Sequence, residues 1–250
     1  MRLALVVVCA LAASARADEP QADDQPAYQL RLDVDVPVMV GGALLTSAWF
    51  LDLGPAWCAP QCDPARLNPI DRPFAGRYHP TWTTLGTVTT GALILGSPAL
   101  LLAHEKLGFA ANDTIVVAEA ALATSAVSAI FQTGIRRPRP FLYGTAAPLE
   151  QREETNASLS FFSGHTSQAF AVTVATYATL CRLHSRYRYV VLGVGLAAAS
   201  FVGVSRVASG DHFPTDVLVG AGVGASIGWL VPALHSRHVQ LTGTGIAGTF

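Results

Sequence analysis

The residues with the clearest chemical potential occur in one stretch, Ser205-Arg206-Val207-Ala208-Ser209-Gly210-Asp211-His212-Phe213-Pro214-Thr215-Asp216. Apolar, glycine-rich runs flank it on both sides, which predicts a turn between two hydrophobic helices. Pro214 suits the first position of the second helix, where its missing N–H costs nothing. Asp216 follows His212 by four positions, so we expect its carboxylate to orient the imidazole for nucleophilic or base catalysis. The simpler alternative is that both residues only cap the helix.

Two earlier stretches add groups that suit a phosphate ligand, Gln132-Thr133-Gly134-Ile135-Arg136-Arg137-Pro138-Arg139-Pro140 and Phe161-Phe162-Ser163-Gly164-His165. A phosphate monoester is a dianion and needs several hydrogen-bond donors. The guanidinium groups of Arg139 and Arg206 can each donate two charge-assisted hydrogen bonds in a rigid fork. Ser163 and the N–H groups near Gly164 lie at a predicted helix start, where partial positive charge favours anions.

Together the three stretches resemble the signature of the type 2 phosphatidic acid phosphatase superfamily. That signature reads Lys-x6-Arg-Pro, then Pro-Ser-Gly-His, then Ser-Arg-x5-His-x3-Asp. The third part matches here at every specified position, whereas Gln132 replaces the lysine and Phe162 replaces the first proline of the second part. The order of the parts also fits, and the resemblance covers about residues 80–235.

The resemblance implies a role for each matched residue. His212 would attack phosphorus and form a phosphohistidine intermediate, Asp216 would hold its tautomer, and His165 would protonate the departing oxygen. The phosphate-binding residues would be Arg139, Arg206, Ser163 and Gly164, with Gln132 contributing weakly from the lysine position. No metal ion or other cofactor is expected to take part.

Composition favours a membrane protein over a soluble one. Of 250 residues, 51% are hydrophobic and 13% are charged, whereas soluble domains carry about 25% charged residues. The mean hydropathy is +0.39. The net charge of -1 argues against a nucleic-acid binder, which would present a basic face. Neither a glycine-rich nucleotide loop nor a Cys/His cluster at zinc spacing occurs in the sequence.

Six apolar runs, each near the length that spans a bilayer, predict the fold. They lie at about residues 36–53, 84–103, 112–135, 164–182, 189–207 and 214–234. We therefore expect an all-α, integral-membrane bundle of about six helices with the three motifs gathered at one membrane face. The first run, which Gly41 and Gly42 interrupt, is the weakest. Gly224 lies in a four-residue repeat of glycines in the last run, which predicts close helix packing.

The expected organisation is a signal peptide at 1–17, an exposed acidic lead-in at 18–35, a membrane domain at 36–237 and a short tail at 238–250. An uncleaved N-terminal anchor is the alternative for residues 1–17. Two long loops, 54–83 and 141–162, are expected to lie over the site and to touch the substrate. Arg136 and Arg137 are interpreted as lipid-headgroup contacts, and lone histidines such as His235 as interfacial residues.

The membrane face of the motifs is a separate question. Cys58 and Cys62 form either a local disulfide, which needs an oxidising compartment, or a pair of free thiols. A cleaved leader followed by a crossing run at 36–53 would bring the motifs to the cytoplasmic face. Resemblance to bacterial relatives favours a multi-pass protein of the inner membrane with its site facing the periplasm. That orientation requires that the run at 36–53 does not cross the membrane.

The predicted function is hydrolysis of a lipid phosphate or diphosphate, with the lipid bilayer and the lipid substrate as partners. No nucleic acid and no obligate protein partner is expected. A vanadium-dependent haloperoxidase would use a similar anion pocket, but those enzymes are soluble. A third possibility, which Gln132 favours, is a catalytically weakened membrane protein that binds anionic lipid headgroups without turnover.

Overall fold

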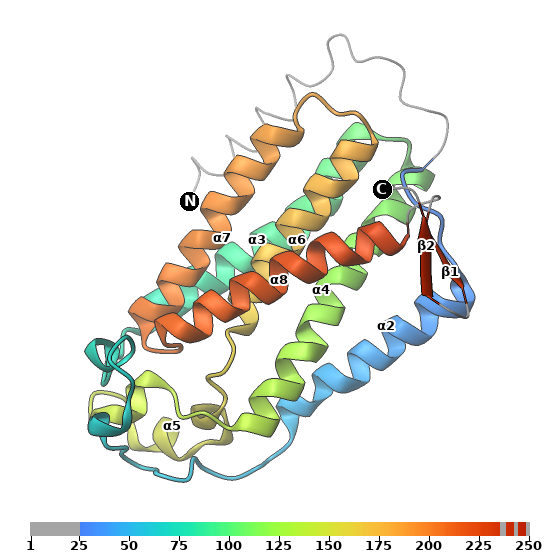
Figure 1. The fold of residues 1–250 in the computed structure, drawn as a ribbon. Coiled ribbons are helices and arrows are strands. Elements are labelled where there is room, and N and C mark those ends of the chain that lie inside the picture. The colour runs from blue at the N-terminus through green and yellow to red at the C-terminus, as the bar shows by residue number, and fades with distance from the viewer. Residues whose placement is uncertain (1–25, 236–238, 243–244, 249–250) are drawn as a thin grey trace.

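The computed structural model describes residues 26–235, 239–242 and 245–248 (Figure 1). The expected signal peptide at 1–17 lies outside the described residues. The α-helices are α2 (Leu32–Thr46), α3 (Pro80–His104), α4 (Leu107–Ile135), α5 (Leu149–Glu153), α6 (Gly164–Arg182), α7 (Arg188–Ser209) and α8 (Pro214–Leu234). Short 3-10 helices are η2 (Ser47–Phe50), η3 (Pro64–Arg66), η4 (Arg72–Phe74), η5 (Pro140–Tyr143) and η6 (Thr155–Ser158).

The six long helices coincide with the six predicted apolar runs, which confirms the all-α membrane bundle. Within the described residues, five segments are long and apolar enough to cross a bilayer: 32–50, 80–104, 107–143, 188–209 and 214–234. The sixth long helix, α6, does not qualify because it is rich in threonine and serine. It packs against α3, α4, α7 and α8, so most of those side chains are buried against protein. Thr176 and Thr179, for example, donate to carbonyl groups one turn back on α6.

Helices α6 and α8 pack with their backbones in contact. A Cβ atom added at Gly224 would lie 2.0 Å from the carbonyl oxygen of Ser167, and one at Gly228 would lie 2.4 Å from that of Ala171. Small residues at such crossings are a general device of membrane helices, because lipid offers no hydrophobic force between them. The predicted packing role of these glycines is therefore confirmed.

Loops gather at one end of the bundle, where α4 and α7 end and where α6 and α8 begin (Figure 1). Gly210 ends α7 with φ of +84°, and a Cβ atom there would lie 1.9 Å from the carbonyl oxygen of Arg77. Only glycine fits a position that needs both a left-handed backbone and so close an approach. The loop that precedes α3 is thus held against the turn between α7 and α8. We call this end of the bundle the loop end.

A disulfide joins Cys58 to Cys62, which decides between the two states that the sequence left open. Cys62 is buried in a small apolar cluster with Phe141 and Leu142, and its N–H donates to the carbonyl oxygen of Leu142. The two long loops therefore pack on each other at the loop end, and their contact with the substrate stays a prediction.

The two ends of the described chain depart from the expected boundaries. Helix α2 begins at Leu32, four residues before the expected domain boundary, and with η2 it forms a candidate membrane span. The expectation that the first run does not cross therefore has little support. In the expected C-terminal tail, β1 (Val239–Thr242) and β2 (Gly245–Gly248) form an antiparallel hairpin in which Val239 pairs with Gly248.

Gly224→Ala should lower the thermal unfolding temperature of the detergent-solubilised protein, because the added methyl group overlaps the Ser167 carbonyl. Overpacking of this kind costs about 1–3 kcal/mol. Gly222→Ala is the matched control, since nothing lies within 4 Å of a Cβ atom at that position of the same helix. Equal unfolding temperatures for the two variants would contradict the close contact between α6 and α8.

Candidate active site

His212 lies in the turn between α7 and α8 at the loop end and is 3% exposed. Its Nδ1 atom lies 2.7 Å from the carbonyl oxygen of Ser160. A carbonyl only accepts, so the Nδ1 atom carries the proton and Nε2 carries a lone pair. Burial, followed by the positive charge of Arg139, lowers the pKa of His212 well below its ordinary value. The imidazole is therefore neutral and has a nucleophilic nitrogen.

Asp216 does not contact the imidazole, so the direct contact expected from the sequence is wrong. Its Oδ2 atom accepts hydrogen bonds from the backbone N–H of Phe213 at 2.9 Å and from the Ser160 hydroxyl at 2.6 Å. A carboxylate at the third position of a helix favours this conformation, in which the side chain bends back toward the helix start. There it accepts a hydrogen bond from a backbone N–H that has no partner within the helix. Asp216 thus caps α8 and reaches His212 only through Ser160, which it holds.

Arg137 neutralises the buried carboxylate of Asp216. One of its terminal nitrogens donates to Oδ1 of Asp216, and the other lies 2.7 Å from Oδ2 of Asp71. The hydroxyl of Thr215 also donates to Asp71, at 2.7 Å. The interpretation of Arg137 as a headgroup contact is therefore wrong. Arg136 likewise donates to two backbone carbonyl groups of the loop before α3, at 2.7 and 2.9 Å.

The two motif arginines, Arg139 and Arg206, converge on the carboxylate of Asp211. One nitrogen of Arg139 lies 3.5 Å from its Oδ1 atom, and one of Arg206 lies 3.2 Å from its Oδ2 atom. Burial alone would raise the pKa of Asp211, but the positive charges around it, Arg139 first, lower it. Arg206 is also anchored to α3 through the Thr83 carbonyl and the Thr87 hydroxyl, at 3.0 and 2.8 Å.

Arg139 retains capacity to bind an anion. Its terminal NH2 group donates to the side-chain oxygen of Asn156 at 2.8 Å, but its buried Nε–H has no acceptor in the described part of the chain. Leaving a buried donor unpaired is costly, about 1–3 kcal/mol, and an anion that enters the site removes that cost.

Helix α6 presents its N-terminus to the same region. Ser163 precedes the helix, and no side chain from the described residues caps it, so the first N–H groups are open to an anion. The Ser163 hydroxyl shares a hydrogen bond of 2.8 Å with that of Thr166. His165, in the first turn, lies within electrostatic reach of Arg206 and Arg139. Two guanidinium groups, one helix N-terminus and two imidazoles therefore converge at the loop end.

Gln132 contacts protein rather than open space. Its amide nitrogen donates to the carbonyl oxygen of Phe162 at 2.7 Å and to the hydroxyl of Ser128 at 3.1 Å. These bonds hold the segment that leads into Ser163. Direct binding of phosphate by Gln132 stays a prediction, whereas its contacts give it a positioning role next to Gly164.

Sequence reasoning did not assign Asp71, Ser160, Asp211 or Asn156 to the site. Asp211 precedes His212 directly, and an acidic residue between a predicted phosphate-binding arginine and the predicted nucleophile was a signal that could have been used. Asp71 gave no such signal, because it lies 144 positions before Thr215, which it contacts. Its place in the site follows only from how the loop before α3 folds back.

Comparison with protein families matches residues 113–240 to the PAP2 superfamily, just over half of the chain. Among characterised proteins, the lipid A 1-phosphatase of Porphyromonas gingivalis is 41% identical over 80 residues. That alignment covers 32% of this chain and 17% of the relative's length.

Two solved structures resemble the bundle. One is a transmembrane PAP2-type phosphatidylglycerolphosphate phosphatase from Bacillus subtilis, with 23% identity and a TM-score of 0.47 over 80% of this chain and 94% of that one. The other is LpxE of Aquifex aeolicus, with 21% identity and a TM-score of 0.46 over 64% of this chain and 90% of that one.

Asp71→Asn should destabilise the protein more at pH 7 than at pH 3, as measured by thermal unfolding in detergent. Hydrogen bonds, from Arg137 first, outweigh burial and lower the pKa of Asp71 below its usual range. The stabilisation from a carboxylate with a lowered pKa is present above about pH 4 and is lost as the pH falls through the folded pKa. Because Arg137 keeps Asp216 as a partner, the cost should be smaller than the about 3–5 kcal/mol of a buried charge left unpaired.

The exposed Asp63 provides the control, because Asp63→Asn keeps a capping side chain at η3 and breaks no ion pair in the described residues. A loss of stability for Asp71→Asn that is the same at both pH values would argue against a charged pair with Arg137.

Proposed function

The chain belongs to the PAP2 superfamily, and from that membership we propose that it hydrolyses a lipid phosphate or diphosphate through a phosphohistidine intermediate. The observation that carries the proposal is the state of His212. It is buried and neutral, its Nδ1–H is fixed on a backbone carbonyl, and two motif arginines lie close enough to act on its charge. A nucleophile beside an anion-binding site is what phosphoryl transfer requires.

In the first step the phosphate dianion lies against Arg139, Arg206 and the N-terminus of α6. The Nε2 lone pair of His212 attacks phosphorus in line, and the bond from phosphorus to the alcohol oxygen breaks. The departing oxygen takes a proton from His165 and leaves as a neutral alcohol. In the second step His165 accepts a proton from water, whose oxygen attacks phosphorus, and the P–N bond breaks to release inorganic phosphate and His212.

The positive charge that develops on His212 is stabilised through the Ser160 carbonyl and the nearby carboxylate of Asp211. His165 needs a proton at the moment of attack, although its burial and then the positive charges of Arg206 and Arg139 disfavour a cation there. A bound dianion reverses that balance, because its two negative charges favour the imidazolium. Substrate binding therefore prepares the acid for the leaving group.

A lipid substrate fits the position of the site. The motifs lie at one end of a bundle with five candidate membrane spans, where a phosphate at the bilayer surface would meet them. The relatives that match are named for lipid A and for phosphatidylglycerolphosphate. Both carry a phosphate group on a membrane lipid, and we propose that class for this chain.

His212→Ala should abolish phosphate release from a panel of lipid phosphates by detergent-solubilised protein. The unaltered protein, quenched during turnover with a radiolabelled lipid phosphate, should carry a label that is stable to base and labile to acid, as a P–N bond is. The label should be absent from His212→Ala.

His184→Asn is a suitable control, because His184 is an exposed histidine at the other end of the bundle with a left-handed backbone that asparagine tolerates. Near-normal turnover by His212→Ala, or label on another residue, would refute the assignment. Binding of lipid phosphates without release by the unaltered protein would favour a headgroup-binding protein instead.

We further propose that the site faces the periplasm of a bacterial inner membrane. The Cys58–Cys62 disulfide lies in the loops at the loop end, and such bonds persist in oxidising compartments. Helix α2 is a candidate span that runs toward the loop end, where Trp49 lies near Gly164. An outward site then leaves the chain before α2 in the cytoplasm. That placement departs from the cleaved signal peptide expected at residues 1–17, which would leave the following chain in the periplasm.

A single cysteine at the exposed Glu150 in α5 should react with a membrane-impermeant thiol reagent in intact cells, in a background with Cys9, Cys58, Cys62 and Cys181 replaced by serine. A single cysteine at His184, at the opposite end of the bundle, should react only after permeabilisation. The reverse pattern would place the site in the cytoplasm.

A further inference from the structure

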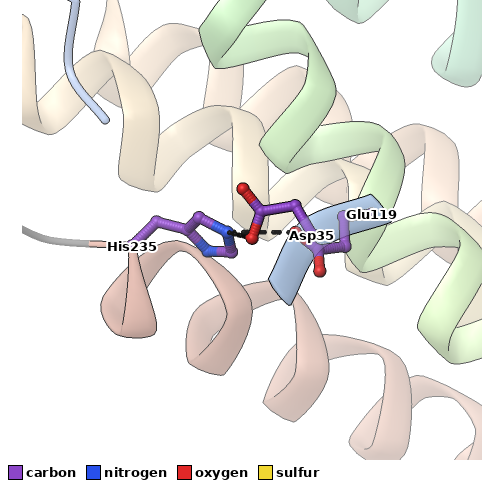
Figure 2. Close-up of side chains that lie close together, drawn as sticks. All are labelled: Asp35, Glu119 and His235. Carbon is purple, nitrogen blue, oxygen red and sulfur yellow. Dashed lines mark hydrogen bonds and ion pairs between the residues drawn. The ribbon is translucent and has the colours of Figure 1, made fainter. Parts of the chain in front are cut away.

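Three side chains that can ligate a metal meet away from the loop end, beside the middle of α4, and we call them the triad: Asp35, Glu119 and His235 (Figure 2). They come from α2, from α4 and from the residue that follows α8. Their ligand atoms all lie within 4.8 Å of one another. The side chains of Asp35 and Glu119 are each 5% exposed and that of His235 is 11% exposed, so the interfacial interpretation of His235 is wrong.

The hydrogen bonds around the triad leave one acceptor unpaired. The Nδ1 atom of His235 lies 2.9 Å from the Val231 carbonyl oxygen, so it carries a proton. The Nε2 atom points at Oδ1 of Asp35, 3.2 Å away. Oε2 of Glu119 also lies 3.1 Å from Nε2, but it is buried and accepts no hydrogen bond from the described residues. Only the Asp35 carboxylate has a hydrogen bond with Nε2, so Oε2 of Glu119 is left unpaired among the described residues.

The net charge of the triad also indicates that a cation belongs there. Two carboxylates and one imidazolium sum to one negative charge, and two carboxylates with a neutral imidazole sum to two. Ionisable groups within a membrane bundle are costly unless they are paired. The backbone N–H of Arg31 donates to Asp35 at 2.6 Å and relieves part of that cost, but it adds no full charge. A divalent cation would neutralise both carboxylates.

We propose that the triad binds a divalent transition-metal ion, with Zn²⁺ as the best fit. An imidazole nitrogen with two carboxylate oxygens is a common donor set for zinc, whereas Mg²⁺ and Ca²⁺ take oxygen ligands. With bonds of about 2.0–2.1 Å, neighbouring ligands of tetrahedral zinc lie about 3.3–3.4 Å apart. The Nε2 atom lies 3.2 and 3.1 Å from its two partner oxygens, close to that spacing.

The second shell of the triad also suits a metal. A histidine that binds zinc usually donates its other ring N–H to a carbonyl or carboxylate, which fixes the tautomer and directs the lone pair at the ion. The Val231 carbonyl does this for His235. The ion would join the start of α2 to α4 and to the end of α8. Of the long helices, α2 packs extensively only on α4, so this link would secure it to the bundle.

The test measures metal binding by the full chain in detergent. The protein is stripped with a chelator, reloaded with Zn²⁺ and desalted, and the zinc per chain is measured by mass spectrometry. We expect one zinc per chain and a higher unfolding temperature than that of the stripped protein. Glu119→Gln and His235→Asn should each weaken zinc binding tenfold or more, since even losing a second-shell partner weakens binding by about 10–100-fold.

Asp35→Asn should weaken zinc binding to the same extent as the other two substitutions. Asp33→Asn is its matched control, because Asp33 lies in the same helical turn, is exposed and pairs only with Arg31 among the described residues. It should bind zinc like the unaltered chain. Zinc binding that is equal in the unaltered chain and in Glu119→Gln would overturn the proposal. So would a stripped chain that takes up no zinc, which would leave a hydrogen-bonded triad without metal.

A second measurement needs no substitution and therefore does not depend on how the variants fold. Co²⁺ added to the stripped, unaltered chain should produce visible absorption bands of a four-coordinate ion, and one equivalent of Zn²⁺ should remove them. Absence of the bands would contradict the proposal. Phosphate release depends on residues at the loop end, so neither result bears on the proposed phosphatase activity.

Discussion

The buried carboxylate of Asp216 is the group on which the arrangement of the site depends. A carboxylate in a membrane bundle needs partners, and this one finds them on three different segments. It caps its own helix, holds the Ser160 hydroxyl and pairs with Arg137, which in turn fixes Asp71 in the distant loop before α3. The Ser160 backbone that positions the His212 imidazole is therefore held by the same charge that fixes the start of α8.

The overall fold could be predicted from the sequence because it follows from hydrophobicity, which is a local property. Runs of about twenty apolar residues can only become helices in lipid, so helix number and order could be read directly. The matched residues of the three motifs also lie at one end of the bundle as expected. Even the role of Gly224 could be foreseen, because small residues at four-residue spacing face a neighbouring helix.

The contacts within the site could not be predicted in the same way. The four-residue spacing of His212 and Asp216 allowed a direct contact, but at a helix start the carboxylate had a nearer donor in its own backbone. From the sequence, Arg137 was interpreted as a lipid-headgroup contact. It forms an internal ion pair with Asp71 only because the loop that carries Asp71 folds back onto it. His235 had no motif around it, and its partners are 116 and 200 positions away in the chain. Sequence spacing carries no information about such pairs.

The polar character of α6 has a consequence for how membrane topology is counted. A hydropathy count finds five spans in the described residues, and an odd number would put the two ends of the bundle chain on opposite sides of the membrane. The sixth long helix is hidden from such a count because protein rather than lipid surrounds it. Once α6 is included the number is even, and both ends return to the same side. That parity is what allows Asp35, near the first residue of the bundle, to meet His235, just after the last.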